Sequence, residues 1–248
     1  MSRWATVVLA VALPGLTAGA QSQDMESLLR RSDVGGFVPT TFRARLTLQQ
    51  DGVPGTSEIE LWRSGADRTL VRFLDAKERG KYLLRLGADL WFLAPGAKNP
   101  VRLSPTHRIY GAATLDVLLG LRLADDYRIT NSSTQTDPQG PLVVLELAAR
   151  SERQQFATVR YVVRPATDRP VSALYRLQSR REATLIEFFD WTGGARGQRY
   201  ARRIHVRDLL RKGALTRIEA TVFEERPVPD GLFDLKDHSA RRALEKEK

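Results

Sequence analysis

From residue 41 onward, apolar and polar residues alternate with a period of two, which is the pattern of a half-buried β-strand. The first example, "TFRARLTLQQDG", alternates four apolar residues with arginine and threonine and then reaches a turn at Asp51-Gly52. Similar segments continue along most of the chain, separated by turn residues such as Asp168-Arg169-Pro170. The pattern predicts about ten or eleven strands, and their short connections predict one long antiparallel sheet.

Two segments break this rhythm with helical spacing. Residues 24–33 place Met25, Leu28 and Leu29 as on an amphipathic helix. Residues 111–126 are apolar nearly all round, with Thr114 as N-cap and three leucines on one face: Leu115, Leu118 and Leu119. A helix that is apolar on all sides is buried against protein or against a ligand.

These elements predict a mainly β protein with a few helices. A sheet of ten or eleven strands curls, since twisted open sheets rarely exceed about ten strands without closing or splitting. We therefore expect a single large antiparallel curled sheet, an unclosed β-barrel covered by helices. Neither a repeat nor a linker is visible, so residues 21–235 should form one domain. The charged C-terminal tail, residues 236–248, should fray.

The stretch "KYLLRLGADLWFLAP", residues 81–95, predicts a hairpin whose second strand has two apolar faces. Leu90, Trp91, Phe92 and Leu93 are consecutive, and neighbouring side chains on a strand point to opposite sides. We expect Trp91 and Leu93 on one side of the sheet and Leu90 and Phe92 on the other. One pair would face the cavity inside the curl, and the other would pack beneath a loop or the N-terminal helix.

Residues 1–20 have the three-part pattern of a secretory signal peptide. Arg3 is followed by an apolar run, Ala5–Leu16, and then by the small-x-small pattern Ala18-Gly19-Ala20. A run of about 12 residues is shorter than the ~20 that a membrane-spanning helix requires. A buried N-terminal helix is the alternative interpretation. The chain contains no cysteine, and an exported protein without disulfides suits the periplasm of a Gram-negative bacterium.

The charge is basic. The 39 lysines and arginines less Arg3, set against 29 acidic residues, leave a net charge of +9 after signal removal. Such a balance indicates a polyanionic neighbour, and the export signal favours an anionic lipid surface over nucleic acid. Arginines dispersed along strands, as at Arg43 and Arg45, are instead typical of a solvated face. Ordinary solubility therefore remains the alternative to peripheral contact with a membrane.

Motifs for catalysis or metal binding are missing from the sequence. The three histidines, His107, His205 and His238, are far apart and match no metal-ligand spacing. A nucleophile elbow and a phosphate loop are both lacking, and Asp125-Asp126 is more typical of solvated acids than of a catalytic pair. We expect a protein without catalytic activity, metal or cofactor. A hydrolase on a β scaffold, the alternative, would need a carboxylate or histidine dyad brought together by folding.

Large apolar residues recur on the predicted strands. Singly, each is typical of an ordinary core. Several segments nevertheless show two apolar faces, notably residues 90–93, 142–147 and 185–191, and apolar lining beyond the needs of the core is how a hydrophobic ligand site is made. The candidate ligand-binding residues on strands are Trp62, Phe73, Trp91, Leu93, Phe188, Trp191 and Phe223.

The hairpin "RGKYLLRLGADLWFLAPGAKNPVRLSPTHRIYG", residues 79–111, resembles that of the periplasmic outer-membrane lipoprotein-sorting proteins with the LolA/LolB-like fold. The order of elements agrees along the mature chain: a short helix, a strand meander, this hairpin, an apolar helix, more strands and a closing "VPDGLFDL". The resemblance implies an unclosed β-barrel whose apolar interior binds acyl chains. Carried over by position, Trp91 and Leu93 would line its wall, and Leu115, Leu118 and Leu119 would form a helical plug.

The function implied by this resemblance is that of a periplasmic carrier or chaperone. It would bind a lipid or the acyl chains of a lipoprotein for transfer towards the outer membrane, with an inner-membrane transporter as donor or an outer-membrane acceptor as partner. We expect a monomer. The alternative is a lipid-sensing regulatory or transporter-associated interaction module, which genomic neighbours or a pull-down would distinguish.

Overall fold

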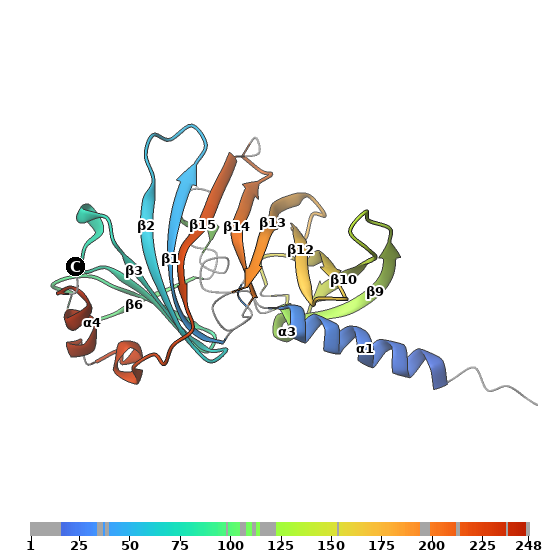
Figure 1. Cartoon of the computed structure of the whole chain (residues 1–248), viewed down its shortest axis with the longest axis horizontal. Helices are drawn as coiled ribbons and strands as arrows, with labels where there is room; N and C mark the ends of the chain where they lie inside the picture. Colours follow the sequence, from blue (N-terminus) through green and yellow to red (C-terminus); the bar gives the residue numbers. More distant parts are fainter. Residues whose placement is uncertain are drawn as a thin grey trace, which may run out of the picture.

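The computed structural model consists of one large β-sheet with helices at its two ends (Figure 1). The residues described are 16–33, 37, 40–97, 99–104, 108–110, 113–114, 123–152, 154–193, 199–211, 214–236 and 238–246. The helices are α1 (Leu16–Ser32), α3 (Leu123–Asp126) and α4 (Ser239–Leu244), with 3-10 turns η1 (Ala76–Glu78) and η2 (Asp230–Phe233).

The sheet combines strands from both halves of the chain. The first half supplies β1 (Thr41–Gln50), β2 (Ser57–Ser64), β3 (Arg68–Phe73), β4 (Tyr82–Leu86), β5 (Asp89–Leu93) and β6 (Val101–Leu103). The second half supplies β9 (Tyr127–Gln135), β10 (Leu142–Ala149), β11 (Thr158–Arg164), β12 (Arg169–Arg176), β13 (Glu182–Gly193), β14 (Arg199–Asp208) and β15 (Ala214–Glu224). Two further strands, β7 (Arg108–Tyr110) and β8 (Ala113–Thr114), pair separately.

The strand order is β6-β5-β4-β3-β2-β1-β15-β14-β13-β12-β11-β10-β9. Every pairing is antiparallel, and β1 joins the two halves by pairing with β15. The predicted single antiparallel sheet is confirmed. It contains 13 strands, more than the ten or eleven expected, and the strands from β3 to β6 are short, with three to six residues each. The edge strands β6 and β9 do not pair with each other, so the sheet is unclosed.

Register shifts bend the strands of the second half. They occur in the pairings of β9 with β10, β11 with β12, and β12 with β13, and another lies between β1 and β15. A β-bulge bends its strand and increases the local twist. These register shifts therefore help the 13-stranded sheet to curl.

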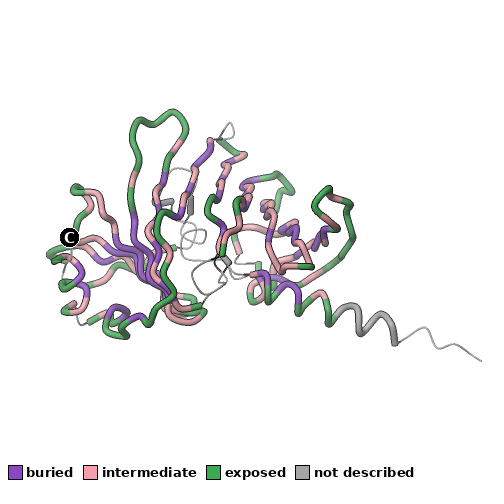
Figure 2. The backbone as a smooth tube through the Cα atoms, in the orientation of Figure 1, coloured by how far each residue is buried: buried purple, intermediate pink, exposed green. Residues whose placement is uncertain are grey.

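The two faces of the sheet carry separate apolar clusters. The Phe42 face is the side that holds Phe42, Leu61, Val71, Leu90 and Ile218, and its cluster extends to Leu145 and Tyr161 at the far end of the sheet. The Trp62 face is the opposite side, and it holds Trp62, Leu70, Tyr82, Leu84 and Leu93. Figure 2 shows the buried backbone running along the strands of both halves.

The C-terminal segment covers the Trp62 face. Val228, Leu232, Phe233 and Leu244 pack on the second cluster, and Leu244 is 6% exposed. The expectation that residues 236–248 fray is therefore wrong for α4. The apolar outer side of β2 to β5 needs a cover, and a segment with one well-placed leucine supplies it despite its charged composition.

The Trp62 face also buries charge. Glu60 is 1% exposed and accepts hydrogen bonds from Arg43 Nε at 2.8 Å, Trp62 Nε1 at 3.1 Å and Arg72 Nη1 at 3.4 Å. Arg43 also contacts Glu224. The interpretation of Arg43 as part of a merely solvated face is thus wrong, because a buried carboxylate one strand away requires a cation.

The two predicted helices have different outcomes. The helix expected over residues 24–33 is confirmed; it begins at Leu16 and ends at Ser32, with Leu28 and Leu29 buried. The predicted helix of residues 111–126 is described only at its ends. Thr114 is the last residue of β8, and Leu123–Asp126 is helical; the residues that Thr114 would cap lie outside the described part of the chain. Leu115, Leu118 and Leu119 lie outside the described residues.

The packing of α4 predicts that Leu244→Ala lowers the free energy of unfolding by about 2 to 3 kcal/mol, because it removes a buried side chain from the Trp62 face. Lys246→Ala is the matched control: its exposed side chain follows α4, and its effect should stay within ~0.5 kcal/mol. Urea denaturation followed by tryptophan fluorescence measures both values. Equal unfolding midpoints for the two variants would contradict the packing of α4.

Candidate functional site

The Phe42 face carries a stack of aromatic rings where the two halves of the sheet meet. Phe37 stacks on Phe42 with ring centroids 5.0 Å apart, and Phe223 lies 5.0 Å from Phe42 and 4.4 Å from Tyr200. These residues come from β1, β14, β15 and the segment that precedes β1. Phe42 and Phe37 are buried, while Tyr200 and Phe223 are half-buried.

Further half-buried apolar side chains extend this surface along the sheet. Trp191 on β13 lies 6.4 Å from Phe188, and the guanidinium of Arg169 lies over its ring at 5.7 Å. The half-buried apolar residues that pack on the core of this face include Met25, Phe73, Phe92, Leu103, Ile129, Trp191, Tyr200 and Phe223. Partly exposed apolar side chains that share one face are typical of a surface for an apolar ligand.

The structure separates the predicted ligand-binding residues. Four of them lie together in the cluster of the Phe42 face: Phe73, Phe188, Trp191 and Phe223. Three lie on the Trp62 face and pack with the C-terminal segment: Trp62, Trp91 and Leu93. The resemblance had placed Trp91 and Leu93 on the cavity wall, whereas Leu90 and Phe92 take the Phe42 side of that strand. The expected packing of β5 on both of its sides is therefore confirmed. The side with Trp91 and Leu93 is covered by the C-terminal segment and not by the cavity, a loop or the N-terminal helix.

Charged side chains meet on the Phe42 face at the C-terminal end of α1. Asp33 Oδ2 accepts a hydrogen bond from the backbone N–H of Ala124 at 2.9 Å, and Tyr161 Oη donates to Ser32 O at 2.7 Å. The Asp33 carboxylate also interacts electrostatically with Arg85 on β4 and with Tyr161 on β11. Since β4 and β11 lie far apart in the strand order, the Phe42 face must be the concave one.

The charges at this junction are perturbed by burial. Burial raises the pKa of the Asp33 carboxyl from 3.8 to about 6, although the Ala124 N–H favours the charged form. Burial and the neighbouring Arg85 lower the pKa of Arg63 to about 10, and the Arg63 guanidinium lies 5.3 Å from the Phe42 ring centroid. Our sequence reasoning missed these residues. The period of two did contain a signal, because Arg63 follows Ile59 and Leu61 on the same face of β2.

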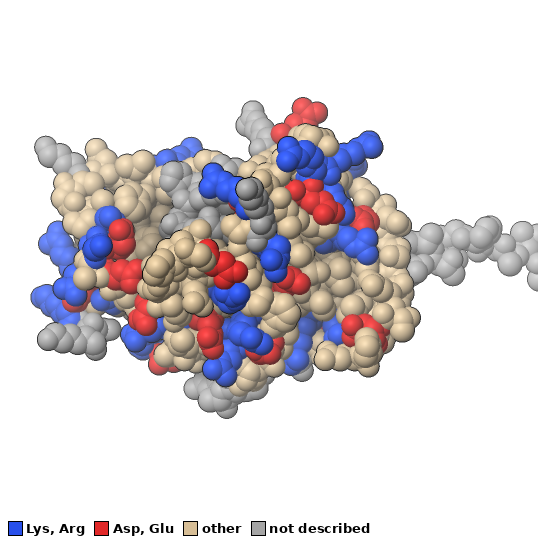
Figure 3. All heavy atoms as spheres, turned by 90° about the horizontal axis from the view of Figure 1, so that it is seen from above, with Lys and Arg blue, Asp and Glu red and all other residues tan. Residues whose placement is uncertain are grey.

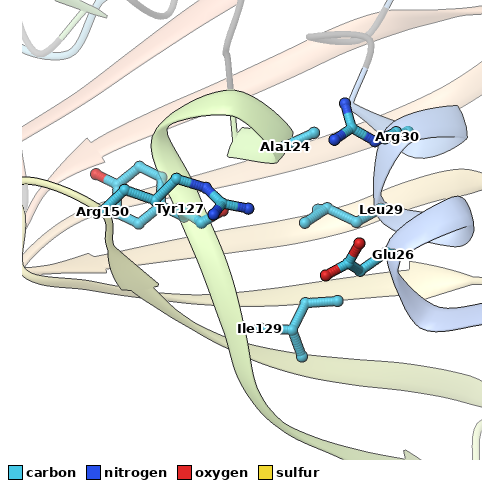
Figure 4. A pocket seen from close by; sticks show the side chains of 7 residues that line it. All are labelled: Glu26, Leu29, Arg30, Ala124, Tyr127, Ile129 and Arg150. Carbon is cyan, nitrogen blue, oxygen red and sulfur yellow. The ribbon is translucent and has the colours of Figure 1, made fainter. Parts of the chain in front are cut away.

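A small notch lies between α1, α3 and β9 (Figure 4). Its lining includes Leu29, Tyr127 and Ile129, and the Arg150 side chain closes one side by donating from Nε to Tyr127 O at 3.0 Å. The volume is about 10 Å³, enough for one water molecule and too small for an acyl chain.

Charges on the surface are mixed. On the face seen in Figure 3, basic and acidic side chains are interspersed, and ion pairs such as Arg164 with Asp137 at 2.8 Å hold several arginines. Within the described part of the chain, no three histidine, aspartate or glutamate side chains lie close enough together to hold a metal ion. His107 lies outside that part. None of the described helices is long and apolar enough to cross a membrane.

The raised pKa of Asp33 predicts a pH dependence of stability. Between pH 4 and pH 6 the folded protein retains a proton that the unfolded chain has lost, so the free energy of unfolding falls as the pH rises. The loss should be about 3 kcal/mol and complete above about pH 7. Asp33→Asn removes this contribution, and its advantage over wild type should therefore grow with pH.

Urea unfolding from pH 4.0 to pH 7.5 measures this difference. Asp230→Asn serves as the control, because the side chain of Asp230 is 81% exposed and its replacement should leave the wild-type pH profile unchanged. Parallel profiles for wild type and Asp33→Asn would show that the carboxyl titrates as in the unfolded chain.

Known structures with the same architecture are distant in sequence. No protein-family model and no curated protein matches the chain at a significant level. A LolA superfamily protein from Nitrosomonas europaea superposes with a TM-score of 0.74 at 22% identity, covering 84% of this chain and 96% of its own. A putative outer membrane lipoprotein-sorting protein domain from Vibrio parahaemolyticus gives 0.71 at 12% identity, covering 90% and 97%.

A DUF1329 family protein from Desulfovibrio piger gives a TM-score of 0.70 at 17% identity, covering 88% of this chain and 98% of its own. All three likenesses extend over nearly the whole of the other chain. At these identities they establish the architecture and not the ligand. Together with the unclosed 13-stranded sheet, they show that the chain has the LolA-like fold.

Proposed function

We propose that the protein is a carrier or chaperone that holds a lipid, or the acyl chains of a lipoprotein, on the Phe42 face. The observation that carries this proposal is the row of half-buried aromatic and aliphatic side chains on the concave face of an unclosed sheet. The similarity to a protein described as a putative outer membrane lipoprotein-sorting domain supports it. Binding without chemistry is enough to account for the site.

Energetics favour an acyl chain on such a surface. Each methylene transferred from water contributes roughly 0.8 kcal/mol, so about ten buried carbons contribute ~8 kcal/mol before ordering costs. We propose that Phe73, Phe188, Trp191 and Phe223 contact the chain. Leu115, Leu118 and Leu119 are proposed as a plug that leaves when the ligand enters, since release then needs only a shift between two populated states.

The proposed location is the periplasm, reached through the signal peptide of residues 1–20. A donor in the inner membrane, such as a transporter, would deliver the ligand, and an acceptor at the outer membrane would take it. The basic charge of the chain favours peripheral contact with anionic lipid head groups at either membrane. Nucleic acid plays no part in this proposal.

Phe223→Asp tests the proposal, because it places a charge among the stacked rings of the Phe42 face. We expect this variant to lose at least 90% of the lipid that co-purifies with wild type from a bacterial periplasm without detergent. Native mass spectrometry followed by organic extraction measures the lipid. Its matched control is Val222→Asp: the neighbouring side chain pairs opposite Arg45 on the other face of β15 and is 37% exposed.

Val222→Asp should retain the wild-type amount of lipid, and circular dichroism should confirm that both variants are folded. A wild-type protein that carries no lipid and takes none from added vesicles would refute the carrier function. Equal lipid in both aspartate variants would place the ligand somewhere other than the Phe42 face.

A further inference from the structure

A second apolar cleft lies on the other side of the sheet, between α4 and the open end of the β4–β5 hairpin. Its volume is about 460 Å³, within the range of roughly 300 to 1,000 Å³ that is typical of small-molecule sites. Leu93, Ala94 and Pro95 line one side, and residues of α4 line the other. In Figure 1, α4 lies beside the β3 end of the sheet, at the opposite end from α1.

The walls of this cleft are held in place by specific contacts. Tyr82 Oη lies 2.6 Å from Glu245 Oε1 and 3.1 Å from Arg241 O, and Arg72 Nε lies 3.2 Å from the same Glu245 oxygen. Opposite α4, Gly80 has a φ of +78°, and a Cβ at this position would lie 2.8 Å from Pro95 Cγ. The hairpin and the helix thus form a preorganised site, which lowers the cost of binding.

The polar groups around the cleft favour an anion. Glu245 is already matched by Arg72 and Tyr82, whereas Arg242 is exposed and forms no ion pair with another described residue. Arg241 Nη2 lies 3.0 Å from His238 Nδ1. Because arginine can only donate, Nδ1 must accept, and the imidazole proton resides on Nε2. A guanidinium and an imidazole N–H therefore stand beside an apolar wall.

We infer that this cleft binds an amphiphile with one apolar chain and one anionic head, a carboxylate or a phosphate monoester. The chain lies on Leu93 and Pro95, and the head accepts hydrogen bonds from Arg242 and His238. Arginine suits both heads because its planar group binds two oxygens at once. The site is separate from the Phe42 face, since the sheet lies between them, and it does not depend on the carrier function.

Methyl NMR of the full mature chain can locate this binding. Titration with sodium decanoate, and in a second arm with decyl phosphate, should shift the Leu93 methyl signals saturably at submillimolar concentration. The Ile218 methyl signals, on the Phe42 face, distinguish the two sites. Shifts at Ile218 alone would overturn the cleft and leave the carrier proposal standing, while shifts at Leu93 alone would support the cleft whatever the outcome for the carrier.

Two variants on exposed positions test the contacts without disturbing the core. Arg242→Glu should weaken decanoate binding at least tenfold, whereas Lys246→Glu, the same charge reversal outside the cleft lining, should weaken it less than twofold. Ala97→Trp fills the cleft from an exposed turn and should abolish the Leu93 shifts. Equal affinity for decanoate, decanol and decyltrimethylammonium, or no shift at Leu93 up to 5 mM ligand, would overturn the proposal.

Discussion

The curl of the sheet depends on the contact between the last turn of α1 and the concave face. The edge strands β6 and β9 form no ladder with each other, so the shape must be held by what fills the curl. Tyr161 on β11 donates to Ser32 O, and the adjacent Asp33 carboxylate acts on Arg85 of β4 and receives the Ala124 N–H of α3. One helix end thus connects strands from both halves of the sheet. Desolvation makes the charged form of the Asp33 carboxyl unfavourable there, and this is why its pKa is raised.

A sheet that is apolar on both sides must be covered on both sides. The Phe42 face is covered partly by α1, and the aromatic rings of the adjacent strands β1, β15 and β14 pack on one another there. The outer side of β2 to β5 cannot be covered in this way, and the C-terminal segment with Leu232, Phe233 and Leu244 covers it instead. Because α4 leaves space against the hairpin, the second cover also creates the second cleft.

The alternation of apolar residues predicted the strands, their antiparallel order and the unclosed sheet, because a period of two has a direct geometric cause. The same alternation could not decide which face is concave. Leu93 and Phe92 are equally apolar in the sequence. Their sides are distinguished only by tertiary packing, which places Leu93 against the C-terminal segment and Phe92 in the cluster of the Phe42 face. The expectation that the tail frays was wrong for a related reason. In "SARRALEKEK" the burial of Leu244 and the contacts of Tyr82 with Arg241 O and of Arg72 with Glu245 hold the segment on the sheet despite its charges. The period of two would also have placed Arg63 on the core side, but this signal was missed.

For the ligand proposed on the Phe42 face, specificity would have to come from the few polar groups there. An apolar wall distinguishes ligands mainly by size, since one methylene more or less changes binding by only about 1 to 3 kcal/mol. The aromatic side chains would therefore determine how much apolar surface of the proposed ligand is buried, but they would hardly distinguish one head group from another. Around the end of α1, by contrast, the buried Arg63 and Arg85 and the half-buried Asp33 lie at one side of the same face. A head group bound there would meet cations whose charge is only partly screened. It would also further desolvate the Asp33 carboxyl, whose pKa burial already raises to about 6. In the proposed carrier, the choice of ligand and the charge of the Asp33 carboxyl would therefore be coupled by electrostatics.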